Sequence, residues 1–125
     1  MGLDMFAMKV KKGVITESVD FELPETAEQQ KFHYWRKHPN MHGWMESLYH
    51  EKGGQSDTFN CDNVRITEED LDQLEAAINE EELPDTAGFF FGESEPEDKV
   101  GDLEFVKKAR EAISEGYDVY YTSLW

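Results

Sequence analysis

Residues 32–49 read FHYWRKHPNMHGWMESLY and carry the clearest structural signal in this chain. They contain three of the four histidines and two of the three tryptophans. Apolar side chains then recur at the i, i+3, i+4, i+7, i+8 spacing of one buried helical face, namely Met41, Trp44, Met45, Leu48 and Tyr49. Because proline fits only the first turn, we expect a helix that begins between Lys37 and Pro39 and ends at Gly53-Gly54.

Before this helix the sequence predicts β-structure. Residues 3–10 are apolar on both faces, which is typical of an interior strand, and a turn follows at 11–13. Residues 14–23 place apolar side chains at even spacing and are predicted to pair with the first strand as a hairpin. Residues 25–30 are polar and are expected to form a loop or the frayed start of a helix.

After the helix, strands and helices alternate. Residues 59–66 have strand character, and a helix is predicted from Thr67, which forms a capping-box pattern with Asp70. This helix must end before Pro84. Residues 88–92 predict a short buried strand, residues 103–113 a last helix that ends at Gly116, and residues 119–125 a final strand.

This order predicts one domain with an α+β fold, and α/β is the alternative. Three helices would pack on a mixed sheet of four to five strands. The alternation in the second half allows parallel strand pairs joined by right-handed crossovers, and the order of the strands stays open.

The charge of the chain is strongly negative. There are 28 acidic and 12 basic residues, which gives a net charge of −16 and argues against direct binding of nucleic acid. Between Glu68 and Glu104 lie fifteen acidic residues and one basic residue, Lys99. Such a surface could imitate the charge of DNA and bind a basic protein, or it could serve solubility alone. The candidate interaction residues are Glu68, Glu69, Asp72, Glu75, Glu80, Glu81 and Glu82.

A second candidate site lies in the aromatic, cationic segment. Its side chains could bind a small anion such as a nucleotide or phosphate through the fork of Arg36; they are Trp35, Arg36, Lys37, His38 and His42. The competing interpretation is that Arg36 pairs with an acidic residue or stacks on Trp35. We predict no catalytic residue, no metal site and no cofactor, and an enzyme is the less favoured class.

Cysteine content and hydropathy bear on location. Cys61 is the only cysteine, so no internal disulfide can form, which fits a reducing compartment. The sequence shows neither a signal peptide nor an apolar run of membrane-spanning length, so we expect a cytoplasmic protein that does not span a membrane.

Several motifs together resemble a family of small proteins encoded by bacteriophages and prophages. They are MGLDM at 1–5, YWRK at 34–37 with His42 and Trp44, GFFFG at 88–92, and YYTSLW at 120–125. Members of this family often carry the label phosphoglycerate kinase, but this chain is too short for two substrate domains and has no glycine-rich phosphate loop. The resemblance implies a phage accessory protein in the bacterial cytoplasm. Our leading hypothesis is therefore a non-enzymatic protein that binds a host or phage protein.

Overall fold

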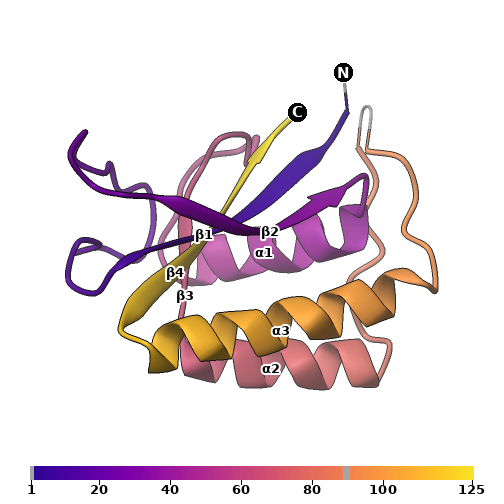
Figure 1. The fold of residues 1–125 in the computed structure, drawn as a ribbon. Coiled ribbons are helices and arrows are strands. Elements are labelled where there is room, and N and C mark those ends of the chain that lie inside the picture. Colours follow the sequence, from indigo (N-terminus) through magenta and orange to yellow (C-terminus); the bar gives the residue numbers. More distant parts are fainter. Residues whose placement is uncertain (1, 89–90) are drawn as a thin grey trace.

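The computed structural model describes residues 2–88 and 91–125 and shows three helices packed on one four-stranded sheet (Figure 1). This confirms the α+β prediction. The elements in chain order are β1 (Asp4–Lys11), β2 (Gln30–Arg36), α1 (Pro39–Glu51), β3 (Val64–Ile66), α2 (Glu68–Asn79), α3 (Asp98–Ser114) and β4 (Tyr117–Leu124). No helix in the described ranges combines the length and apolar character needed to cross a bilayer.

The strand order is β2-β1-β4-β3, and every neighbouring pair is antiparallel. The prediction of a mixed sheet with parallel pairs is therefore wrong. That prediction required a strand between the last two helices, at 88–92. In the structure Gly88 and Phe91 lie in a loop, and Phe89 and Phe90 fall outside the described residues. Between β3 and β4 the chain reverses three times, from β3 into α2, from α2 into α3 and from α3 into β4, so β4 runs antiparallel to β3.

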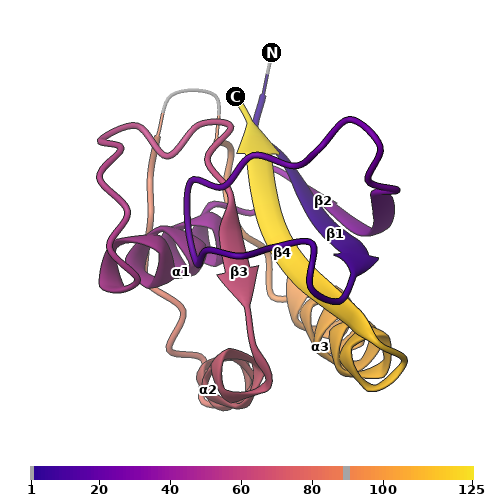
Figure 2. The same cartoon turned by 90° about the vertical axis from the view of Figure 1, so that its left-hand side faces the viewer.

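The sheet is covered differently on its two faces. The three helices cover one face, and the segment 12–29 crosses the other (Figures 1 and 2). On the helix side Met5, Ala7, Trp35 and Tyr121 join the main core. The opposite face buries a smaller cluster of Val10, Ile15, Phe21 and Tyr120.

The predicted strand at 14–23 is the second error. Ile15, Phe21 and Leu23 pack on the outer face of the sheet, whereas Val19 packs against the main core and forms an isolated bridge to Val64. Asp20 has a positive φ of 53°, which a strand cannot accommodate. Instead β1 pairs with β2 and β4, and β2 lies in a stretch for which no strand was predicted.

The boundaries that rest on capping chemistry are confirmed. Helix α1 begins at Pro39, and Gly53 follows its end with a φ of +99°. In α2 the Thr67 hydroxyl accepts from the Asp70 N–H while the Asp70 carboxylate accepts from the Thr67 N–H. Glu104 pairs with Lys108 at 3.0 Å along the exposed side of α3, as the i,i+4 spacing indicates.

Candidate functional site

His38 links the edge strand β2 to helix α1 and is the centre of the candidate site. Lys37, just before it, has a φ of +54°, and its N–H donates to the Leu3 carbonyl at 2.8 Å. This turn directs the chain from the sheet into the helical layer, where Pro39 starts α1. The His38 side chain enters the interior and is only 3% exposed.

A buried carboxylate on α3 holds the imidazole. His38 Nε2 lies 2.8 Å from Oδ2 of Asp102, and the Trp35 indole N–H donates to Oδ1 of the same residue at 3.0 Å. Asp102 is 1% exposed, so both of its oxygens are bound to protein groups instead of water. A buried carboxylate with donors on both oxygens avoids the large free-energy cost of an unpaired buried charge.

Ser94, from the loop before α3, occupies the other side of the imidazole. Its hydroxyl lies 2.6 Å from His38 Nδ1 and accepts the N–H of Asn40 at 3.1 Å. The N-cap residue of α1 is His38, and its side chain forms no capping hydrogen bond with the helix. Ser94 therefore caps the helix from a distant segment while it contacts the histidine. A second carboxylate oxygen, Oδ2 of Asp98, lies 3.5 Å from Nδ1.

The protonation of His38 decides the direction of these hydrogen bonds. With a neutral ring, Nε2–H donates to Asp102 and the Ser94 hydroxyl donates to Nδ1. With a protonated ring, Nδ1–H donates to the Ser94 oxygen instead, and Asp98 and Asp102 flank a cation. The Ser94 hydroxyl can therefore donate to a neutral imidazole or accept from an imidazolium.

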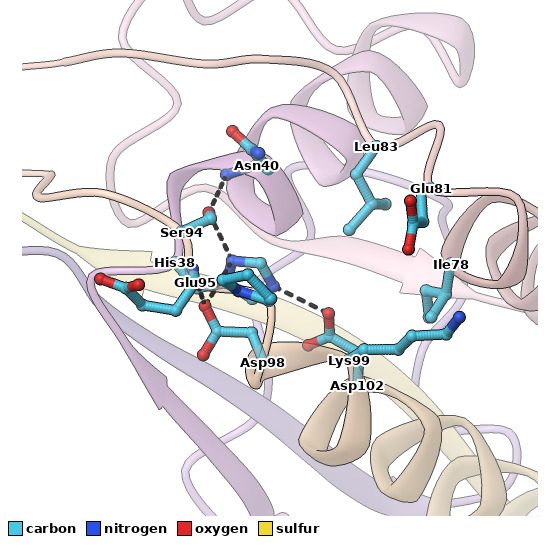
Figure 3. Close-up of a pocket in the computed structure, with 11 residues that line it drawn as sticks. His38, Asn40, Ile78, Glu81, Leu83, Ser94, Glu95, Asp98, Lys99 and Asp102 are labelled. Atoms are coloured by element: carbon cyan, nitrogen blue, oxygen red, sulfur yellow. Dashed lines mark hydrogen bonds and ion pairs between the residues drawn. The ribbon is translucent and has the colours of Figure 1, made fainter.

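A cavity of about 310 Å³ opens beside this network (Figure 3). Its polar wall contains the His38, Ser94 and Asp102 side chains, and its apolar wall contains Ile78 and Leu83. Charges on the wall are mostly negative: Glu81, Glu95, Asp98 and Asp102 against Lys99. Lys99 extends toward Ile78, away from Ser94 (Figure 3). This wall disfavours an anion.

The five residues predicted to bind a ligand are brought together only in part. Trp35 and His38 meet on Asp102. Arg36 is exposed and lies 3.8 Å from Asp4, and Lys37 is exposed beside Gly92.

His42 lies in the core, away from the cavity. Its Nδ1 is 2.6 Å from the Tyr121 hydroxyl, and burial lowers the pKa of His42 to about 4. The same burial raises the pKa of Tyr121 well above its usual value, so both rings stay neutral.

Sequence reasoning missed Asp102 and Ser94. Asp102 precedes Phe105, Val106 and Ala109 by three, four and seven residues, so it lies on the buried stripe of α3. A carboxylate on an apolar stripe indicates a buried polar partner, and this signal was present in the sequence. Ser94 lies in a polar loop and has no comparable pattern.

The seven predicted interaction residues form what we call the acidic surface: Glu68, Glu69, Asp72, Glu75, Glu80, Glu81 and Glu82, along α2 and just after it. Arg110 of α3 binds Asp72 at 2.8 Å and Glu75 at 2.9 Å. The other five carboxylates are exposed and form no ion pair within residues 2–88 and 91–125. Glu81 also lines the cavity, so the two features adjoin.

Across the described part of the chain, no three or more His, Cys, Asp or Glu side chains are arranged to hold a metal ion. Comparisons with known proteins returned no matching family model, no matching curated protein and no matching solved structure.

Proposed function

We propose that this chain is an accessory protein of a bacteriophage or prophage that binds a basic surface of a host or phage protein in the bacterial cytoplasm. The acidic surface is the contact. The proposal rests on the sequence resemblance for its origin and on the charge of that surface for its mode of binding.

The observation that carries the proposal is the position of Glu80, Glu81 and Glu82. They directly follow α2, whose last turn contains no basic residue. Carboxylates at this negative end of a helix dipole destabilise the helix. Glu81 also has a positive φ of 56°, which is unfavourable for a residue with a side chain. Exposed charges that reduce stability are typical of a surface that serves binding.

A basic partner would relieve this repulsion. Lysine and arginine side chains facing the acidic surface would neutralise carboxylates that have no cation of their own, and the net charge of −16 would speed the encounter. Both effects weaken as salt screens the charges.

The test compares two charge-matched variants. One replaces Glu80, Glu81 and Glu82 with glutamine, and the control replaces Glu22, Glu25 and Glu28, three exposed residues of the segment on the opposite face. Each immobilised protein captures partners from bacterial lysate, with and without phage infection, at about 0.1 M and about 1 M salt. Captured proteins are identified by mass spectrometry, purified and measured by calorimetry.

The proposal expects one basic partner that binds the wild-type and control proteins at low salt and binds the Glu80/Glu81/Glu82 variant at least about tenfold more weakly, a loss of about 1.4 kcal/mol. Equal weakening in both variants would indicate nonspecific attraction. Binding that persists unchanged at high salt would contradict an electrostatic contact.

A further inference from the structure

The geometry around His38 points to a second activity, and we propose that Ser94 is a nucleophile in a hydrolytic site for small neutral or cationic esters. His38 is its general base. This activity is separate from partner binding, and the two can fail independently.

The nucleophile and the base are already in contact. The Ser94 oxygen lies 2.6 Å from His38 Nδ1, within the reach that proton transfer requires. A serine hydroxyl is a weak nucleophile unless a neighbouring base removes its proton as it attacks. Neutral His38 leaves the lone pair of Nδ1 directed at this hydroxyl.

Asp102 and Trp35 are positioning residues for the base. Asp102 Oδ2 holds Nε2–H at 2.8 Å, which fixes the tautomer that leaves Nδ1 free to accept. Trp35 fixes Asp102 in turn through its indole N–H. A Ser94 that only capped α1 would need one oxygen lone pair. It would not need a 3%-exposed histidine whose far nitrogen is held by a carboxylate.

The surroundings stabilise the charges that develop during attack. The Asn40 N–H, at the positive end of α1, donates to the Ser94 oxygen at 3.1 Å and stabilises negative charge on that oxygen as its proton moves to His38, before the charge passes to the carbonyl oxygen of the ester. Asp98, 3.5 Å from Nδ1, favours the imidazolium that forms when His38 accepts the proton.

The cavity defines the class of substrate. About 310 Å³ is at the small end for ligand sites, so the substrate is a short molecule. Leu83, Ile78 and Pro96 offer an apolar wall, while Glu81 and Glu95 repel a substrate that carries a carboxylate or phosphate. A short aliphatic ester with a neutral or positively charged end satisfies both conditions.

The chemical step follows from this arrangement. The Ser94 oxygen attacks the ester carbonyl carbon while its proton passes to His38 Nδ1. The bond from carbon to the alcohol oxygen breaks, and the alcohol leaves with that proton. Water, deprotonated by His38, then attacks the acyl carbon. The bond from that carbon to the Ser94 oxygen breaks, the carboxylic acid leaves, and His38 returns the proton to the Ser94 oxygen. Asp102 keeps its contact with Nε2 of His38 in both steps.

The first test uses the full-length wild-type protein and a small alkyl fluorophosphonate. Oγ would bond to phosphorus, fluoride would leave, and the serine proton would pass to His38. Peptide mass spectrometry locates the adduct. We expect modification of Ser94 at least about 100-fold faster than of exposed Ser47 on α1. The Ser47→Ala protein should react like the wild type, and Ser94→Ala should lose the adduct.

The second test measures hydrolysis of two p-nitrophenyl esters of equal length, one ending in trimethylammonium and the other in carboxylate. The cationic ester should react about fivefold faster or more. His38→Gln should abolish both hydrolysis and labelling, with circular dichroism as the check on folding. No adduct at Ser94 on the wild-type protein, or equal reaction at Ser47, overturns the proposal whatever the variants do.

Discussion

Buried polar residues in this protein depend on hydrogen bonds to other residues. No buried side-chain nitrogen or oxygen in the described residues lacks a hydrogen-bond partner. The interior nevertheless holds His38, His42, Asp102 and Tyr121. Composition could predict an aromatic, histidine-rich centre but not these pairings, because the partners are 64 to 79 residues apart in the sequence. Only the fold brings them together.

The hydrogen bond from Trp35 to Asp102 should be worth more than the equivalent bond of Trp125. Both indole N–H groups donate, one to a buried carboxylate at 3.0 Å and one to the Phe59 carbonyl at 3.1 Å. Bonds to charged groups contribute about 1.5–3 kcal/mol and neutral ones about 0.5–1.5 kcal/mol. In urea unfolding, Trp35→Phe should therefore lower the free energy of unfolding about twice as much as Trp125→Phe. Equal losses would show that Asp102 does not depend on the indole.

His42 should make stability depend on pH. Burial lowers its pKa to about 4 in the folded protein, against 6.5 for a histidine exposed to water in the unfolded chain. Above pH 6.5 the ring is mostly neutral in both states, and its contribution to stability is fully present. As the pH falls toward about 4 the unfolded chain gains a proton first, so the free energy of unfolding drops by about 1.4 kcal/mol per pH unit.

The measurement is urea unfolding at about pH 7 and about pH 5, where His42 should contribute a loss of about 2 kcal/mol. His42→Phe should remove that part of the pH dependence, although it lowers stability at both pH values by leaving Tyr121 unpaired. The control is His50→Gln, at an exposed position of α1, which should leave the pH dependence of the free energy of unfolding unchanged. If His42→Phe retains the full dependence, another group is responsible.

The start of a helix could be predicted where the sequence has both apolar residues at helical spacing and a residue typical of a helix start. Helices α1 and α2 have both, and their observed starts follow from Pro39 and Thr67. Strand β2 was not predictable in this way, because its alternation of buried and exposed residues is weak and it runs directly into the helix. The even spacing at 14–23 arose from packing onto the sheet face, which produces the same pattern as strand pairing.

Replacing a glycine with alanine should have opposite effects on stability in α1 and in α3. A Cβ at Gly43 would lie 1.9 Å from Oγ1 of Thr86 and 2.9 Å from its Cβ, whereas a Cβ at Gly101 meets nothing within 4 Å. Alanine favours a helix interior by about 1 kcal/mol over glycine. Gly101→Ala should therefore raise the melting temperature, and Gly43→Ala should lower it because the clash outweighs the propensity.

Combining Gly43→Ala with Thr86→Ala should recover part of the loss, since the hydroxyl and the methyl group that obstruct the new side chain are gone. A melting temperature for Gly43→Ala above that of the wild type would show that residues 84–87 do not pack against α1.

The acidic surface lies on the helical side of the sheet, where α2 and α3 are adjacent. Among the residues described between these two helices, none forms a strand, so the helices follow one another in the order of elements. The excess of acidic residues is evident in the sequence, whereas their role in binding stays a prediction. The direct succession of α2 and α3 could not be predicted, because the strand expected at 88–92 would have separated the two helices along the chain.

The final prediction concerns the effect of this charge on stability. Exposed carboxylates at the negative end of α2 repel one another and the helix dipole, and salt screens that repulsion over a Debye length of about 10 Å at 0.1 M. The Glu80/Glu81/Glu82 glutamine variant should be about 1 kcal/mol more stable than the wild type at low salt, a rise of about 4 °C in melting temperature. Its melting temperature should also depend less on salt. The Glu22/Glu25/Glu28 variant has the same net charge, but Glu28 lines a groove together with Lys11. Its melting temperature should therefore rise less. Calorimetric scans across a salt series measure the melting temperature of both variants. If both melting temperatures rise equally, the total charge governs stability and the position of the charge does not. The acidic surface would then hold no unfavourable repulsion that binding could relieve.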